Sequence, residues 1–290
     1  MRRGLNKIER LAKRPDFRAR PVRALARRLL WRLRWGLSRQ PWQVRTAAGF
    51  KLWIPKSGSG ALIFYQGHSE PETARFLLNN LRPGMTVFDV GAHFGEYTVL
   101  AAQSVGPAGR VHAFEPQPEL FALLERNVTA AGFGNVILNC CAVAERDGEA
   151  EFWRRREPAS SSLAGSAAPD GEVEGVYRVR VCTLDAYSRE HRLTPDVIKA
   201  DVEGAERLVV LGARELCSLP PERAPAWLLE YSPSASARFG DRLEGLWETL
   251  EDLGYCWYEL RPNGTPAPLR GPHPLDAPTQ NLLASKRAWR

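Results

Sequence analysis

Residues 87–95, with the sequence VFDVGAHFG, constrain the fold more than any other part of the chain. An apolar run carries Asp89 near its end and passes directly into two glycines, Gly91 and Gly95. Glycine permits a sharp turn and lets a ligand come close to the backbone, where a Cβ would intrude. The segment therefore predicts a buried strand, a tight turn and a helix, which is the unit that α/β sheets repeat.

A second apolar run, residues 111–114, leads into Glu115 and Pro116. Glu115 follows Gly95 by 20 positions, close to the separation at which a carboxylate reaches the hydroxyls of a bound ribose. The glycine spacing is G-x-x-x-G, not the G-x-G-x-x-G that directs the amino end of a helix at a pyrophosphate. The two segments predict either a site for a nucleoside-type ligand without a diphosphate or an ordinary strand-turn-helix of an α/β enzyme.

Strand and helix patterns alternate through most of the chain after residue 83. Apolar runs predict strands, and apolar residues at three- and four-residue steps predict helices. We expect strands at 86–90, 110–115, 135–139, 197–201, 227–231, 255–260 and 280–285, and helices at 95–104, 117–131, 205–212 and 243–253. Strands that alternate with helices form a parallel sheet covered on both faces, and right-handed connections place the loops of interest at its carboxyl edge.

Three parts are predicted along the chain. Residues 1–45 form a basic amphipathic helical leader, 46–82 a small β/helical pre-domain, and 83–290 the main α/β domain. Residues 149–184 interrupt the α/β pattern with two alternating segments around a Ser-, Ala- and Gly-rich loop. This insertion predicts a β-hairpin whose tip, at 160–163, is a lid or a plain surface loop.

The leader holds the positive charge of the chain. Residues 1–45 contain 15 Lys or Arg against two acidic residues, and because the whole chain carries +7, the rest of it is net negative. Apolar residues recur at helical steps between residues 21 and 40, with arginines at other positions; they are Val22, Leu25, Ala26, Leu29, Leu33 and Gly36. Three interpretations of this helix stay open. It packs on the domain with its basic side in solvent, it binds a membrane surface or an acidic partner, or it is an organelle transit peptide. Trp31 and Trp35, four positions apart, would form a second patch at the level of lipid headgroups.

No run of 18 apolar residues appears, so no transmembrane helix is predicted. The Arg-rich amino terminus also lacks the apolar stretch of a secretory signal. We expect a cytoplasmic protein, with peripheral contact at the inner face of the membrane through residues 1–40. The five cysteines lack metal-ligand spacing, so we predict neither a metal site nor a disulfide; they are Cys140, Cys141, Cys182, Cys217 and Cys256.

Residues 198–206, IKADVEGAE, place four charged side chains where a core strand leaves the sheet. Lys199, Asp201 and Glu203 share one face of an extended chain and would line one wall of a cleft. Asp201 lies at the strand end that faces the glycine turn, so we predict a functional role for it. For Lys199 and Glu206 we favour a salt-bridge cluster that caps the following helix.

On these motifs the chain resembles the FkbM-type methyltransferases, a branch of the seven-stranded S-adenosylmethionine-dependent methyltransferases. The resemblance covers residues from about 65 to 260 and rests on FDVGAHFG at 88–95, FEP at 114–116, Asn127, TLD at 183–185, IKADVEGAE at 198–206, Gly212 and Glu230. It implies a Rossmann-like, mostly parallel α/β sheet in the order 3-2-1-4-5-7-6, with helices on both faces. It also implies S-adenosyl-L-methionine as the cofactor.

The resemblance assigns parts of the cofactor to particular segments. The methionine part would lie on the glycine turn, the ribose on Glu115, and the adenine near residues 141–143. The cofactor-binding residues so predicted are Asp89, Gly91, Ala92, His93, Gly95, Glu115, Pro116, Ala142 and Asp201. One departure is His93, since the family usually has Asn at this position; the imidazole would bond the cofactor or point at the acceptor.

Members of the family typically methylate a hydroxyl oxygen on a sugar or a secondary metabolite. Because the donor is already activated, the protein has to align the reactants and accept the hydroxyl proton. The predicted catalytic residues are Asp201, Glu203 and His93, with Asp201 as the first choice of base. The predicted acceptor is a hydroxylated small molecule or a glycan, not a nucleic acid. Two alternatives are an RNA methyltransferase that uses the basic leader on phosphates and a non-catalytic, membrane-associated scaffold that binds the cofactor.

Overall fold

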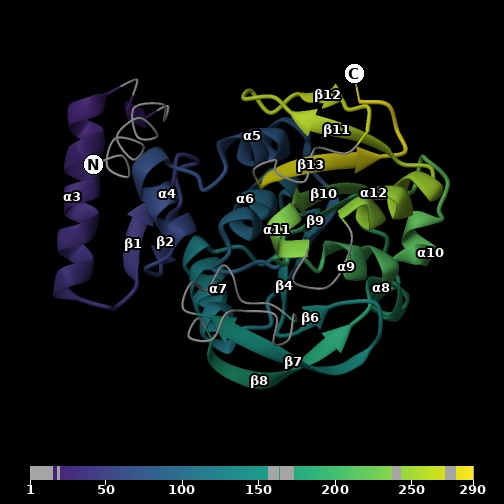
Figure 1. The fold of residues 1–290 in the computed structure, drawn as a ribbon, viewed down its shortest axis with the longest axis horizontal. Coiled ribbons are helices and arrows are strands. Elements are labelled where there is room, and N and C mark those ends of the chain that lie inside the picture. Colours follow the sequence, from purple (N-terminus) through teal and green to yellow (C-terminus); the bar gives the residue numbers. More distant parts are fainter. Residues whose placement is uncertain are drawn as a thin grey trace. The chain divides into compact units, whose positions relative to one another are not determined.

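The structure of the protein is a computed structural model that describes residues 16–17, 20–155, 163, 173–236, 243–271 and 279–289 (Figure 1). The chain divides into two compact units, Met1–Glu70 and Pro71–Arg290. The smaller unit contains both the leader helix and the hairpin that follows it. The three-part division at 45/46 and 82/83 stays a prediction.

The smaller unit is a helix, a two-stranded hairpin and a second helix. Its elements are α3 (Pro21–Leu37), β1 (Trp42–Arg45), β2 (Lys51–Ile54) and α4 (Gly58–Gln66). Pro21 begins α3, where its missing N–H has no intrahelical partner to lose. Strands β1 and β2 are antiparallel, and α4 is capped by the Ser57 hydroxyl, which accepts from the Gly60 N–H at 3.0 Å.

One face of α3 packs inside this unit. Trp31 and Trp35 are only 8% and 5% exposed. The Trp31 ring stacks on Phe64 at 5.7 Å and lies 6.3 Å from Trp42. The prediction that the two tryptophans form a headgroup patch is therefore wrong, because an aromatic cluster buries them.

The larger unit is built on an eight-stranded sheet in the order β12-β11-β13-β10-β9-β3-β4-β5. The strands are β3 (Thr86–Val90), β4 (Arg110–Phe114), β5 (Val136–Asn139), β9 (Val197–Ala200), β10 (Ala226–Tyr231), β11 (Cys256–Leu260), β12 (Pro266–Pro268) and β13 (Gln280–Ser285). Strands β3, β4, β5, β9 and β10 are parallel, whereas β13 is antiparallel to β10 and β11. The predicted fold class is confirmed. Without β12, which the sequence did not predict, the strands numbered along the chain lie in the order 3-2-1-4-5-7-6.

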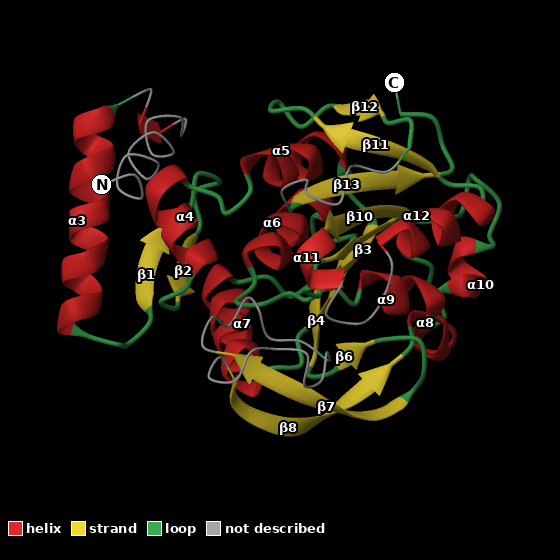
Figure 2. Cartoon of the chain, viewed as in Figure 1, coloured by secondary structure: helices red, strands yellow, loops and turns green. Residues whose placement is uncertain are grey.

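Helices lie on both sides of this sheet (Figure 2). They are α5 (Pro71–Asn80), α6 (Glu96–Val105), α7 (Pro118–Ala131), α8 (Leu184–His191), α9 (Glu206–Leu211), α10 (Arg214–Cys217), α11 (Pro233–Ser236) and α12 (Leu243–Asp252). The main core cluster joins Phe88 and Phe114 of the sheet to Tyr187, Val209 and Trp247 of α8, α9 and α12. Both faces of the central strands are buried, which is why their sequences are nearly continuous apolar runs.

The insertion forms a separate three-stranded sheet in the order β6-β8-β7. Its strands are β6 (Ala142–Val143), β7 (Gly148–Arg155) and β8 (Val173–Cys182), and β7 and β8 form a long antiparallel pair. The predicted lid tip lies outside the described residues except for Leu163, which packs against the small core of this sheet.

The register of the parallel strands sets where the functional loops begin. Val90 of β3 lies opposite Phe114 of β4 and Ala200 of β9, and Ala200 lies opposite Leu229 of β10. Each strand therefore ends at the same edge of the sheet. The residues that come next along the chain at this carboxyl edge are Gly91, Glu115, Asp201 and Glu230.

Candidate active site

The glycine turn after β3 folds over the end of β4. The N–H groups of Gly91 and Ala92 donate to the Phe114 carbonyl at 3.0 and 2.9 Å. Gly91 has φ +78°, and a Cβ on it would lie 1.9 Å from the backbone oxygen of Asp201. The glycine is needed here because the backbone leaving β9 passes directly against it. The group that comes close to the backbone of Gly91 is thus the protein chain at Asp201, and not the ligand expected from the sequence.

Gly95 ends the turn and begins α6. Its φ is +90°, and an added Cβ would lie 2.6 Å from the Leu124 side chain of α7. The turn is also tied to α7 by Asn127, whose side-chain amide donates to the Phe94 carbonyl at 2.7 Å. Glycine at this position lets α7 pack closely on the turn, which fixes the path of residues 91–95.

Glu115 holds the same turn from β4. Its carboxylate is 3% exposed and accepts from the His93 N–H at Oε2 and from the Gln117 N–H at Oε1, both at 2.8 Å. Burial raises the pKa of Glu115 to about 7, against the two backbone hydrogen bonds, which lower it. Each carboxylate oxygen keeps capacity to accept a further hydrogen bond from a ligand hydroxyl.

His93 has a left-handed backbone, with φ 54°. This conformation is uncommon for a residue other than glycine, and it occurs where the surrounding structure imposes it. The imidazole contacts the Phe94 ring at 4.6 Å, and no described residue hydrogen-bonds its buried Nε2. Burial lowers the pKa of His93 to about 4, although the charge of Asp201 opposes this. The imidazole is therefore neutral near pH 7.

Asp89 lies at the end of β3, 2% exposed. Its Oδ2 accepts from the Thr98 hydroxyl at 2.5 Å, and within the described ranges nothing hydrogen-bonds its buried Oδ1. Burial raises the pKa of Asp89, while the nearby Lys199 ammonium lowers it. A buried carboxylate oxygen without a donor is costly, which indicates that this atom serves a ligand.

Lys199 and Asp201 form an ion pair across the exit of β9. The Lys199 ammonium is 3.1 Å from Asp201 Oδ2 and lies 4.9 Å from the centre of the Tyr97 ring. The Lys199 side chain is 3% exposed and that of Asp201 26% exposed. The lysine therefore orients one oxygen of Asp201 from inside the protein, and the carboxylate itself reaches the solvent-accessible edge.

Three carboxylates converge at this edge. One oxygen from each of Asp201, Glu203 and Glu230 lies within 4.8 Å of the other two. Glu203 has φ 58°, the left-handed conformation again, and Glu230 is 8% exposed. Glu203 comes near Asp201 through a turn and not along the extended chain expected from the sequence, because β9 ends at Ala200. Glu230 joins the set because β10 is the parallel neighbour of β9.

Glu206 has a structural role, but it bonds backbone N–H groups, and the partner of Lys199 is Asp201 in place of the predicted cluster with Glu206. Its Oε1 accepts from the Val202 N–H at 2.9 Å and from the Gly204 N–H at 3.3 Å. Burial raises its pKa to about 7. The side chain is 1% exposed, so it closes the turn that carries Asp201 and Glu203 and does not face a ligand.

The remaining predicted residues lie to the side of the turn. Pro116 directly follows Glu115 in the connection to α7, and Ala142 is buried in β6 at 5% exposed. The preceding Cys141 is also buried, with its Sγ 3.5 Å from that of Cys182. This segment, near which the resemblance places the adenine, is therefore apolar and buried.

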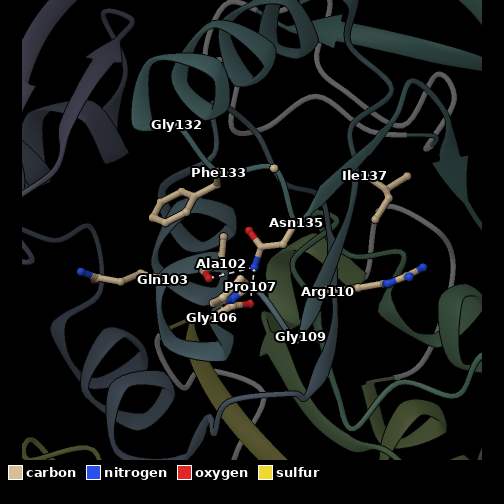
Figure 3. A pocket seen from close by; sticks show the side chains of 11 residues that line it. Ala102, Gln103, Gly106, Pro107, Gly109, Arg110, Gly132, Phe133, Asn135 and Ile137 are labelled. Carbon is tan, nitrogen blue, oxygen red and sulfur yellow. Dashed lines mark hydrogen bonds between the residues drawn. The ribbon is translucent and has the colours of Figure 1, made fainter.

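A cavity of about 690 Å³ lies at the other edge of the sheet (Figure 3). It is lined by the ends of α6 and α7 and by the first residues of β4 and β5, including Gln103, Arg110 and Gly132. Asn135 points into its middle and donates to the carbonyls of Ala102 and Gly106 at 3.0 and 2.8 Å. None of the predicted site residues lines it.

The family follows from comparison with known proteins. A model of the family described as the methyltransferase FkbM domain matches residues 89–256, more than half of the chain. The chain belongs to this family. It therefore contains a methyltransferase domain of the S-adenosylmethionine-dependent type, and the matched residues include the glycine turn, Glu115, Asp201 and Glu230.

Individual relatives match this methyltransferase over shorter stretches. It is 43% identical over 68 residues to the 31-O-demethyl-FK506 methyltransferase FkbM of Streptomyces tacrolimicus, covering 23% of this chain and 25% of that protein. It is 41% identical over 59 residues to a protein-L-isoaspartate O-methyltransferase of Methanothrix thermoacetophila, covering 20% and 28%. The match thus spans less than a third of each relative's length. The solved structure of a precorrin-6y C5,15-methyltransferase from Geobacter metallireducens aligns over 77% of this chain and 89% of that one, with 15% identity and a TM-score of 0.41.

The residues of the methyltransferase fit a polar, nucleoside-containing cofactor. The buried atoms Asp89 Oδ1 and His93 Nε2 have no hydrogen-bond partner among the described residues. Both lie on the strand end and turn that Glu115 braces, so hydroxyl and ammonium groups of a ligand would find acceptors there. The departure from the family pattern at His93 is compatible with this, because a neutral imidazole can accept or donate one hydrogen bond at Nε2.

Sequence reasoning had given no site role to Thr98, had named Glu230 only as a family motif residue, and had favoured a structural role for Lys199. Lys199 orients Asp201, Thr98 orients Asp89, and Glu230 completes the carboxylate set. The signal for Glu230 was present in the sequence, since it follows an apolar strand as Asp89 and Glu115 do. Thr98 contacts Asp89 because the first turns of α6 face the end of β3. The spacing of residues in the sequence does not reveal this orientation.

Proposed function

We propose that this methyltransferase transfers methyl to a hydroxyl oxygen of a sugar, a glycan or another hydroxylated metabolite. S-adenosylmethionine, when bound, supplies the methyl group on a sulfonium. Asp201 accepts the hydroxyl proton, Glu203 and Glu230 hold the acceptor, and the turn from Asp89 to Gly95 with Glu115 holds the cofactor. His93 contributes a hydrogen bond at Nε2 to the cofactor or the acceptor.

The three converging carboxylates are the observation that carries this proposal. Carboxylates accept hydrogen bonds from vicinal hydroxyls, and three of them within 4.8 Å suit an acceptor rich in hydroxyls. The same charge opposes a polyanion such as RNA, whose phosphates these carboxylates would repel. The Lys199 ammonium fixes Oδ2 of Asp201 at 3.1 Å, so Oδ1 is the oxygen that can take a proton from the acceptor.

The test is transfer of a labelled methyl group from S-adenosylmethionine to neutral oligosaccharides, lipid-linked glycans and RNA, offered separately. We expect label in a hydroxylated acceptor as a base-stable ether. With that acceptor, Asp201→Asn should lower kcat by about 100-fold or more with little change in cofactor affinity, since it removes the base and keeps the shape. Asp252→Asn, an exposed change on α12, is the matched control and should leave kcat unchanged.

Three results would count against this proposal. Label that accumulates in RNA would support the alternative acceptor, and full turnover of Asp201→Asn would remove the assigned base. Activity that vanishes with a chelator and returns with a divalent cation would show that the carboxylates bind metal instead of the acceptor.

We also propose that the enzyme contacts membranes peripherally, through the part of residues 1–40 that the structure describes. No helix within the described ranges has the length and apolar content needed to cross a bilayer. The exposed leucines of α3 support contact at a surface instead.

A further inference from the structure

Helix α3 has a second apolar face that is exposed among the residues of its unit that the structure describes. Six of the eight exposed large apolar side chains among the described residues lie on this helix. They are Val22, Leu25, Leu29, Leu30, Leu33 and Leu37, which are 79, 57, 59, 48, 55 and 87% exposed. Because the residues recur at three- and four-residue steps, they form one stripe along the helix. We call these six residues the leucine stripe.

The leucine stripe is not the face that folds the unit. The opposite face carries Ala24, Trp31 and Trp35, which are 3, 8 and 5% exposed. The Trp31 ring lies 5.7 Å from Phe64 and 5.4 Å from Trp35. The aromatic cluster therefore anchors α3 and directs the stripe away from the core of its unit. A stripe this long has no role in that packing.

Two sets of arginines lie on the helix. Arg27, Arg28 and Arg34 support the tryptophan face: Arg27 donates to the Tyr65 carbonyl at 3.1 Å, Arg28 pairs with Asp16 at 2.7 Å, and Arg34 donates to the Ser38 carbonyl at 3.1 Å. Arg23 and Arg32 are exposed instead. At about 100° per residue they lie on opposite sides of the leucine stripe. The helix contains no acidic residue.

We propose that the leucine stripe of α3 binds the surface of an anionic phospholipid bilayer, with the helix lying flat in the plane of the interface. The leucines enter the boundary between headgroups and acyl chains, and Arg23 and Arg32 pair with phosphates on either side. The helix carries cations and no acidic residue, so its charge is complementary to an anionic surface. Five arginines in 17 residues exclude a spanning orientation.

The aromatic cluster gives this contact a fixed geometry. A helix that is already folded and anchored binds a surface without the loss of conformational entropy that a disordered segment would pay. This inference rests on the proposed peripheral membrane contact and not on the identity of the acceptor, because the leucine stripe contains none of the residues assigned to the methyl-transfer site.

The test is co-sedimentation of the full-length protein with vesicles of phosphatidylcholine alone and of phosphatidylcholine mixed with phosphatidylglycerol. We expect binding to the anionic vesicles that weakens as salt rises, and much weaker binding to the neutral ones. The double variant Leu29→Glu with Leu33→Glu should bind anionic vesicles at least about 100-fold more weakly, because two apolar side chains are lost and two negative charges are added.

Leu78→Glu is the matched control. Leu78 is 44% exposed on α5, in the larger unit, and the substitution makes the same chemical change away from α3. It should bind as the unaltered protein does. Circular dichroism checks that the double variant remains folded, which its exposed positions lead us to expect. Arg23→Gln with Arg32→Gln should reduce the preference for anionic over neutral vesicles by about tenfold or more.

Three outcomes would overturn the proposal. The first is equal or absent binding to the two vesicle types, and the second is full binding by the Leu29→Glu, Leu33→Glu variant. The third is a dimer in sedimentation equilibrium that dissociates in this variant while vesicle binding persists, which would mean that the stripe pairs with a second copy of the chain.

Discussion

The two edges of the central sheet differ in how their polar groups are satisfied. At the amino edge, a cavity of about 690 Å³ contains an amide, Asn135, that is bonded to two helix-end carbonyls. At the carboxyl edge, Asp89 and His93 each keep a buried polar atom that no described residue bonds, and three carboxylates converge. The edge that carries unsatisfied buried groups and charge is the one with a chemical task.

The largest expected difference between the edges is in the tolerance of their left-handed glycines. Gly91→Ala would place a Cβ 1.9 Å from the Asp201 carbonyl, so the turn or β9 must move. We expect a loss of at least about 3 kcal/mol in the free energy of unfolding, together with loss of cofactor binding. Chemical denaturation and calorimetric titration with S-adenosylmethionine measure the two effects.

Gly132→Ala is the matched control at the amino edge. Gly132 has φ +75°, close to that of Gly91, but a Cβ there would meet nothing within 4 Å. It should cost only the backbone strain of about 1–2 kcal/mol. Equal destabilisation by the two substitutions would show that backbone strain, and not the approach of β9, makes Gly91 necessary.

A smaller but diagnostic effect is expected at Glu115. Its pKa of about 7 means that the buried carboxyl is about half protonated at neutral pH. If ribose hydroxyls donate to the ionised form, binding removes the proton, and affinity for S-adenosylmethionine should rise with pH between 6 and 8. Glu115→Gln should weaken binding by about tenfold or more and abolish this pH dependence.

Titration calorimetry at pH 6, 7 and 8 checks the prediction for Glu115. Arg110→Ala, at the lining of the amino-edge cavity, provides the control and should keep both the affinity and its pH dependence. A Glu115→Gln protein that retains the unaltered pH profile would show that another group titrates on binding.

The smallest expected effect concerns the amino edge itself. Asn135→Ala removes two hydrogen bonds to helix-end carbonyls and should lower the free energy of unfolding by about 1–3 kcal/mol. Cofactor affinity and turnover should not change. The comparison of the two edges fails if this variant loses cofactor affinity while its denaturation midpoint stays the same, because the cavity would then be a binding site.

Much of the larger unit was predictable because its signals are local. The continuous apolar runs and the punctuating glycines predicted the strands to within one residue at most ends, for example 86–90 for β3 and 280–285 for β13. The short strand β12 was missed, since its proline-rich sequence, PAP, has no strand signal. It forms only because β11 offers an edge to pair with.

The helix α3 shows where such reasoning stops. Its periodicity predicted an amphipathic helix but left open whether that helix packs on the domain, and the placement of Trp31 and Trp35 at lipid headgroups was wrong. Leu29 and Trp31 are both apolar and lie on different faces of the helix. The sequence of a helix with two apolar faces does not reveal which face packs against the core. The aromatic side chains of α4 and β1 decide it, because Phe64 and Trp42 form the surface on which Trp31 stacks.

The sequence by itself determined the α/β class and the strand-end positions of Asp89, Glu115 and Asp201, because period, glycine spacing and the place of a carboxylate after an apolar run are written along the chain. The family and the cofactor were implied by the resemblance of its motifs to those of the FkbM-type methyltransferases. Only the tertiary structure decided that the backbone of Asp201 leaves no room for a Cβ on Gly91. It also decided that the carboxylate of Glu230 lies beside those of Asp201 and Glu203, and that the leucines of α3 are exposed. The physical reason is that these are contacts between segments far apart in sequence, which strand register and side-chain packing set and local spacing does not encode.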